Sequence, residues 1–164
     1  MDFLKGTGVA IITPFKKNGE IDFNAYELLI DFYINNGINY LVILGTTGES
    51  HSISFEEKDK ILKSIVKYNK GRLPLIVGFS ANNTQKLVNE LSNFELESFS
   101  AVLSVCPYYN KPSQVGLYEH FLHVSKASPI PLILYDVPSR TGVSISNETI
   151  FKLLDKCENI IGIK

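Results

Sequence analysis

The sequence has little net charge and no long apolar run, and each shortage excludes a class of protein. Its 164 residues carry a formal net charge of −1, which offers no basic field for nucleic acid and no polybasic membrane anchor. The longest apolar runs, such as YLVILG from residue 40, are far shorter than the ~18 residues of a membrane span. We therefore expect neither nucleic acid nor a membrane among its partners.

Features of exported proteins are also missing. The N-terminal stretch MDFLKGTG lacks a charged leader followed by an apolar core, so it does not read as a secretory signal. Only two cysteines are present, and Cys106 and Cys157 lie in no CxxC spacing. We expect both as small buried hydrophobic side chains in a reducing compartment. The sequence thus predicts a cytoplasmic globular protein.

What the chain does have is a regular alternation of two patterns. Short apolar runs without polar alternation are typical of parallel strands buried on both faces; they lie near Val9, Tyr40, Leu75, Ala101, Pro131 and Ile160. Amphipathic segments between them predict helices over 23–37, 54–68, 84–94, 114–126 and 148–156. The first has an N-cap candidate in Asp22 and a stop at Gly37, and the second opens with the capping box Ser54–Glu57.

This alternation predicts the fold class, α/β. A period of roughly 30 residues implies parallel strands joined by right-handed crossovers, in a doubly wound sheet or a (β/α)8 barrel. No GxGxxG follows the first run, which favours the barrel. Such a barrel has eight strands in about 250 residues. We therefore interpret residues 1–164 as the N-terminal part, about the first six βα units, of a single TIM-barrel domain.

Polar residues gather where the predicted strands end, which is where such barrels carry their chemistry. The motif GTTGES, Gly45–Ser50, is not a Walker loop, because no GK[ST] closes it. Its glycines and threonines offer N–H and O–H donors to a small carboxylate. An ordinary glycine turn before a capped helix is the alternative.

The last predicted strand, IIGIK, ends on Lys164. A lysine amine is a nucleophile only when neutral, and an apolar pocket favours that form. Flanked by Ile160, Ile161 and Ile163, this amine can attack a ketone and form a Schiff base. The alternative is a lysine that extends from a strand end into solvent.

Three loop tyrosines and one arginine add further candidates. Tyr108, Tyr109 and Tyr135 are either packed aromatics or, with a threonine in reach, proton carriers for imine chemistry. Arg140 in PSRTG has the forked donor geometry that suits a second carboxylate.

Two histidines raise the question of a metal. His120 and His123 stand three apart on a predicted helix. No carboxylate, cysteine or third histidine is placed to complete the ligand set. We therefore expect no metal site.

The motifs together resemble the dihydrodipicolinate synthase family, within the pyruvate-dependent class I aldolases that include N-acetylneuraminate lyase. GTGVAIITPF, GTTGES, PYYNKPSQVGLYEHF, YDVPSRTG and IIGIK follow the order and spacing of that family along the whole chain. The double threonine and the arginine of SRTG resemble the synthase rather than the lyase.

This resemblance implies a role for each candidate. Lys164 matches the lysine that forms an imine with pyruvate. Tyr135, Thr46 and Tyr109 match a proton relay, in which Tyr109 reaches in from the neighbouring subunit of a tight dimer. The partner expected is thus a second copy of the chain, and family habit implies a dimer of dimers.

Two further residues match substrate contacts. Thr47 corresponds to a holder of the pyruvate carboxylate, and Arg140 to the group that binds the carboxylate of aspartate semialdehyde. The implied reaction is a Schiff-base condensation of these two small molecules in diaminopimelate and lysine biosynthesis. It requires no metal and no organic cofactor, because the lysine itself serves as the electron sink.

Alternatives to this reading remain. One is another pyruvate-dependent 2-keto acid aldolase of the same superfamily, and another is a non-catalytic subunit or fragment. The family continues past its lysine for two more strands and a helical extension. We therefore expect residues 1–164 to belong to a longer protein and to be marginally stable and inactive on their own.

One departure from the family pattern predicts weak feedback by lysine. Members that lysine inhibits bind it with polar residues just past GTTGES and with a glutamate early in the third helix. Here His51, Phe55 and Lys58 follow the motif, and Lys86 replaces the glutamate. Because a cation at Lys86 repels the ammonium groups of lysine, millimolar lysine should leave the activity nearly unchanged. Strong inhibition in a steady-state assay would contradict this prediction.

Overall fold

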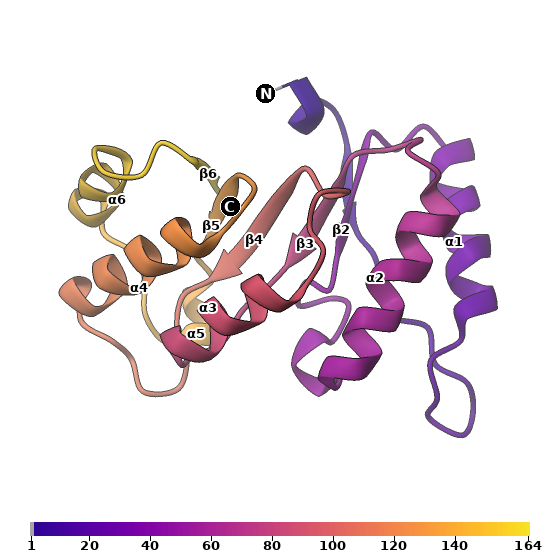
Figure 1. Ribbon diagram of the computed structural model, residues 1–164, viewed down its shortest axis with the longest axis horizontal. Helices are drawn as coiled ribbons and strands as arrows, with labels where there is room; N and C mark the ends of the chain where they lie inside the picture. The colour runs from indigo at the N-terminus through magenta and orange to yellow at the C-terminus, as the bar shows by residue number, and fades with distance from the viewer. Residues whose placement is uncertain (1) are drawn as a thin grey trace. The chain divides into compact units, whose positions relative to one another are not determined.

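The computed structural model describes residues 2–164, which form two compact units (Figure 1). The first unit runs to Gly78 and includes Ser98–Ser100. The second comprises Phe79–Glu97 and Ala101–Lys164. Each unit holds three parallel strands with helices between them, so the predicted alternation of six parallel strands with helices is confirmed.

In the first unit the strands pair in chain order. The elements are η1 Asp2–Leu4, β1 Gly8–Ala10, α1 Phe23–Asn35, β2 Tyr40–Ile43, η2 Ser50–Ser52, α2 Phe55–Asn69 and β3 Leu75–Gly78. β2 pairs with β1 on one side and with β3 on the other. Helices α1 and α2 pack side by side on one side of these strands (Figure 1).

Both helix starts in this unit follow the sequence signals. The Asp22 carboxylate accepts hydrogen bonds from the backbone N–H groups of Asn24 and Ala25, at 3.1 Å each. At α2, the Ser54 hydroxyl accepts from the Glu57 N–H while the Glu57 carboxylate accepts from the Ser54 N–H, which completes the capping box. The caps satisfy N–H groups that the first helical turn leaves without partners.

The second unit repeats the arrangement. Its elements are α3 Thr84–Asn93, β4 Ala101–Val105, α4 Gln114–Ala127, β5 Leu132–Tyr135, α5 Pro138–Thr141, α6 Asn147–Leu154 and β6 Ile160–Ile163. β5 lies between β4 and β6, and α4 packs against both α3 and α6. The single turn α5 was not predicted, because four residues are too short to show a helical period.

The burial of the strands departs from the prediction at two of them. Every residue of β3 and β4 is buried, and nearly all of β2 and β5, as expected for parallel strands. The prediction of burial on both faces is wrong for β1 and β6, which are partly exposed. The reason is that β1 pairs only with β2 inside its unit and β6 only with β5, so one edge of each lacks a strand neighbour.

Within residues 2–164, no helix has both the length and the apolar character needed to cross a membrane. Both cysteines are buried and free, as the sequence predicted.

Candidate active site

The predicted site residues all lie at or just past the C-terminal ends of strands, but they divide between the two units. Thr46 and Thr47 follow β2 in the first unit. In the second unit Tyr135 ends β5, Lys164 follows β6, Tyr109 lies on the loop after β4, and Arg140 lies on the single turn α5.

The GTTGES segment forms two successive tight turns. The Gly48 N–H donates to the Gly45 carbonyl at 3.0 Å, and the Glu49 N–H donates to the Thr46 carbonyl at 3.1 Å. Both glycines are buried, whereas the side chains of Thr46 and Thr47 are exposed. The turn thus buries its backbone corners and presents two adjacent hydroxyl groups to solvent.

A buried chain of hydrogen bonds holds this turn in place. The Tyr26 hydroxyl on α1 donates to the Thr13 hydroxyl at 2.9 Å, and Thr13 donates to the Gly48 carbonyl at 2.6 Å. Burial raises the pKa of Tyr26 to about 12, so its hydroxyl keeps its proton at any physiological pH. Sequence reasoning missed both residues; the available signal was a polar threonine at the end of the apolar run VAII.

Two backbone features also shape the start of this turn. Leu44 is buried and adopts a left-handed conformation with φ of 54°. Gly78, at the end of β3, lies so close that a Cβ atom there would sit 2.2 Å from the Leu44 carbonyl oxygen. Only glycine fits at position 78, because such a contact involves backbone rather than a mobile side chain.

In the second unit the structure brings Lys164 and Tyr135 together. The Lys164 Nζ lies 5.0 Å from the centroid of the Tyr135 ring, within the range of a cation–π contact. The strand ladder fixes this neighbourhood: the Lys164 N–H donates to the Leu134 carbonyl at 2.9 Å, and the Asp136 N–H donates to the Lys164 carbonyl at 3.0 Å. Adjacent parallel strands thus place the predicted nucleophile beside the predicted proton carrier.

The surroundings of Lys164 are less apolar than its sequence context predicted. Ile160 is buried, but Ile161 is only half-buried and Ile163 is 48% exposed. The Lys164 side chain is itself exposed. The described residues therefore set the direction of the amine but do not enclose it, and the apolar pocket stays a prediction.

Tyr109 projects from the loop after β4. Its side chain is 86% exposed, and its backbone is left-handed with φ of 76°, as is that of Lys111 with φ of 50°. A residue with a side chain adopts this conformation at a cost of about 1 kcal/mol or more. The left-handed backbone thus lowers the stability of the loop, and the Tyr109 ring that it carries stays exposed.

Arg140 lies on the single turn α5 and is exposed. The next residue, Thr141, is buried and donates to the Val143 carbonyl at 2.8 Å. Gly142 ends the turn with φ of 74°, a conformation that glycine adopts without strain. The forked guanidinium donors are therefore available to a ligand.

The contacts of Cys106, and those of the histidine pair His120 and His123, indicate structural rather than catalytic roles. The Cys106 thiol donates to the Asp136 carboxylate at 3.7 Å, and burial together with that negative charge raises the pKa of Cys106 to about 12. The thiol stays protonated and is not a nucleophile.

The two histidines contact different groups and do not form a pair that holds a metal ion. His120 is buried and its Nδ1 contacts the Thr84 hydroxyl at 2.9 Å, whereas His123 is exposed and its Nδ1 lies 2.7 Å from the Glu119 carbonyl oxygen. Across residues 2–164, no group of three or more His, Cys, Asp or Glu side chains is placed to hold a metal ion.

The burial of His120 predicts loss of stability in acid. Burial, and then the nearby His123, lower the pKa of His120 from 6.5 to about 4, so the folded state binds fewer protons than the unfolded state between these values. The free energy of unfolding should be highest above pH 6.5 and should fall by up to about 3 kcal/mol as the pH drops to 4.

Urea unfolding of the full-length protein between pH 7 and pH 4 measures this fall. His120→Asn retains a polar partner for Thr84 and should flatten the pH dependence, whereas His123→Asn removes only the smaller of the two causes and should flatten it less. An unaltered slope in His120→Asn would show that other groups cause the acid sensitivity.

Comparisons with known proteins match this geometry to one family. The profile of the dihydrodipicolinate synthetase family matches residues 3–164. The 4-hydroxy-tetrahydrodipicolinate synthase of Flavobacterium psychrophilum is 51% identical over 159 residues, which cover 97% of this chain and 54% of that protein.

Solved structures give the same result. Dihydrodipicolinate synthase from Aquifex aeolicus superposes with a TM-score of 0.91 at 45% identity, covering 97% of this chain and 54% of that one. The chloride-inhibited dihydrodipicolinate synthase from Acinetobacter baumannii, complexed with pyruvate, gives a TM-score of 0.92 at 42% identity and the same coverage. This chain thus spans about half the length of the relatives it matches. The prediction of a partial (β/α)8 barrel is confirmed.

Proposed function

The chain belongs to the dihydrodipicolinate synthetase family, and on this basis we propose that the whole protein is a 4-hydroxy-tetrahydrodipicolinate synthase. It condenses pyruvate with aspartate 4-semialdehyde in diaminopimelate and lysine biosynthesis. The observation that carries the proposal is the position of the Lys164 amine at the end of β6, 5.0 Å from the Tyr135 ring centroid.

The reaction begins with a covalent step at Lys164. The neutral amine attacks the keto carbon of pyruvate, a C–N bond forms, and loss of water gives the imine. A proton leaves the methyl group, and the C–H electron pair moves into the imine to give an enamine. The enamine carbon then forms a C–C bond with the aldehyde of the second substrate. Cyclisation by the amino group of that substrate displaces the lysine and frees it for another cycle.

Each proton in this sequence needs a carrier. Tyr135 serves as the carrier nearest the imine, with Thr46 and Tyr109 completing the relay. The proposal is supported by the Tyr135–Lys164 contact and by the exposed hydroxyl of Thr46. The exposure of Tyr109 supports its insertion into a neighbouring subunit, so the active unit is at least a dimer, and we propose a dimer of dimers.

Two exposed residues, Thr47 and Arg140, bind the carboxylates of the two substrates. Thr47 presents its hydroxyl on the GTTGES turn, where it can donate to the carboxylate of pyruvate. Arg140 presents a guanidinium that can bind the carboxylate of aspartate semialdehyde with two parallel hydrogen bonds. The lysine supplies the electron sink, so the chemistry requires neither a metal nor an organic cofactor. Cytoplasmic location follows from the same biosynthetic role and stays part of the proposal.

Chemical trapping tests the proposal directly. The full-length protein is incubated with pyruvate, reduced with borohydride, digested and analysed by mass spectrometry. We expect a reduced pyruvate adduct on the peptide that contains Lys164. If no adduct forms there, the protein is a non-catalytic member of the family.

Arg140 separates this function from that of a related 2-keto acid aldolase. Arg140→Ala removes the bidentate partner of the second carboxylate, so the KM for aspartate semialdehyde should rise about 30-fold, while trapping of pyruvate stays near the wild-type level. Steady-state kinetics with each substrate varied in turn measure both effects. An unchanged KM would favour an aldolase that accepts a different aldehyde.

A further inference from the structure

The turn that carries Arg140 has almost no packed core of its own. Of its four residues only Thr141 is buried, and the segment after it reaches α6 within a few residues. A cavity of about 320 Å³ lies nearby, between α4 and α6, and is lined in part by Gln114 and Thr149. Within residues 137–146 only Thr141 and Ile145 are buried, so polar contacts supply much of what holds the turn.

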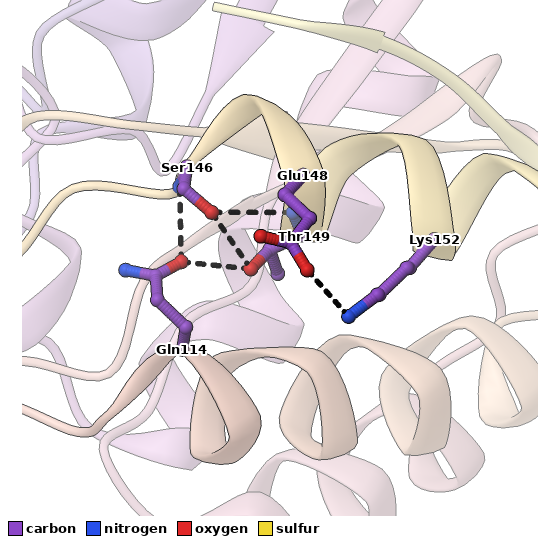
Figure 2. A network of polar contacts seen from close by, with 5 residues as sticks. All are labelled: Gln114, Ser146, Glu148, Thr149 and Lys152. Atoms are coloured by element: carbon purple, nitrogen blue, oxygen red, sulfur yellow. Dashed lines mark hydrogen bonds and ion pairs between the residues drawn. The ribbon is translucent and has the colours of Figure 1, made fainter.

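Gln114, at the start of α4, makes three of these contacts, and Figure 2 shows the two with Ser146 and Thr149. Its Nε2 donates to the Ser144 carbonyl at 2.8 Å, and its Oε1 accepts from the Ser146 N–H at 3.0 Å and from the Thr149 hydroxyl at 2.8 Å. Donor and acceptor of one amide thus bind two backbone groups of the same segment. Ser146 in turn caps α6 by accepting from the Thr149 N–H, so the clamp and the cap involve the same two residues, Ser146 and Thr149.

Asp136 holds the same segment from the other side. Its carboxylate accepts a hydrogen bond from the Ser144 hydroxyl, which closes a loop around residues 137–143 and hence around α5. The other carboxylate oxygen accepts from the Cys106 thiol at the end of β4. The Asp136 N–H also donates to the Lys164 carbonyl, so the carboxylate stands on a backbone position that β6 already fixes.

Ser144 is therefore held twice, through its carbonyl by Gln114 and through its hydroxyl by Asp136. We propose that Gln114 and Asp136 are positioning residues that fix the turn carrying Arg140 and thereby set the affinity of the enzyme for the carboxylate of its aldehyde substrate. This inference rests on the proposed function, because it assigns the ligand of Arg140. Neither residue touches the substrate; both act through the backbone of residues 142–146.

Gln114→Leu in the full-length enzyme tests the clamp. This change keeps the size of the side chain and removes its three hydrogen bonds. We expect the KM for aspartate semialdehyde to rise about tenfold, because a small displacement of a binding group costs this much. Trapping of pyruvate on Lys164 by borohydride should stay within about twofold of wild type. Gln85→Leu is the matched control, because Gln85 lies on α3 and its amide donates to Asn89, one turn further along the same helix.

A second readout does not depend on activity. Amide hydrogen exchange in residues 137–146 should be about tenfold faster in Gln114→Leu than in Gln85→Leu, because opening of the segment no longer breaks the two backbone hydrogen bonds that Gln114 makes with it. Unchanged exchange in that segment overturns the proposal, whatever the enzyme catalyses. Faster exchange with an unchanged KM for the semialdehyde also overturns it, because the turn would then be irrelevant to binding. If the wild-type enzyme traps no pyruvate, the proposed function fails separately.

A pair of substitutions tests the role of Asp136. Asp136→Asn keeps the shape of the side chain and can still bond to Ser144, so its KM for the semialdehyde should stay within about twofold of wild type. Asp136→Leu removes both side-chain bonds and should raise that KM about tenfold, as Gln114→Leu does. A wild-type KM in Asp136→Leu excludes Asp136 from the positioning role.

Discussion

Replacing Lys164 with arginine should abolish Schiff-base formation and reduce turnover by ~10³-fold or more, because removing a nucleophile removes the covalent route altogether. Arginine keeps the positive charge and the length needed to lie over the Tyr135 ring. Its guanidinium does not lose a proton under any physiological condition, so it offers no free amine to a ketone. The substitution therefore removes the nucleophile while it keeps the positive charge.

Two measurements on the full-length enzyme check this result. The rate of condensation should fall to the background of the assay, and borohydride reduction with pyruvate should leave no adduct on the peptide around position 164. Lys156→Arg is the matched control, because Lys156 is an exposed lysine just past α6 and should retain full activity. A Lys164→Arg variant with a tenth of the wild-type rate would show that another group carries the chemistry.

The second large effect concerns stability, at the GTTGES turn of the first unit. Gly78→Ala places a Cβ 2.2 Å from the Leu44 carbonyl oxygen and 2.7 Å from the Leu44 carbonyl carbon. Both neighbours are backbone atoms of a buried residue with φ of 54°, so neither can move without shifting the GTTGES turn. We expect the free energy of unfolding to fall by about 3 kcal/mol or more, in the range of severe core substitutions.

Urea unfolding of the full-length protein measures the loss. Gly45→Ala is the control on the same turn, because a Cβ there would meet only the Val42 Cγ1 at an ordinary 3.7 Å. It should unfold within about 1 kcal/mol of wild type. Equal losses in both variants would mean that the turn is sensitive to any added methyl group rather than to the clash at Gly78.

The sequence alone pointed to the importance of Lys164 but not to that of Gly78. The strand and helix order, both caps at Asp22 and Ser54, and the position of each site residue at the end of a strand all followed from the sequence pattern. Lys164 could be singled out because a cation ends an apolar run that has the pattern of a buried strand. The clash at Gly78 could not, since it depends on Leu44, 34 positions away in the chain.

The polar contacts that hold the candidate site were equally hidden. Thr13, Tyr26 and Gly48 form one buried chain of hydrogen bonds, although they come from three separate segments. Gln114 reads in the sequence as a good helix former near an N-terminus, and nothing local reveals that its amide clamps Ser144. Such contacts join groups 13 to 35 residues apart, whereas propensity and periodicity describe only near neighbours.

The sequence by itself determined the class of fold and the candidate chemistry, because apolar periodicity and the spacing of motifs are local properties of the chain. Only the tertiary structure decided how those residues are held: Lys164 beside Tyr135, the GTTGES turn on Thr13, and the Arg140 turn between Gln114 and Asp136. The physical reason is that a hydrogen bond or a steric contact depends on distances of a few ångströms, which are fixed only when separate strands and helices pack together.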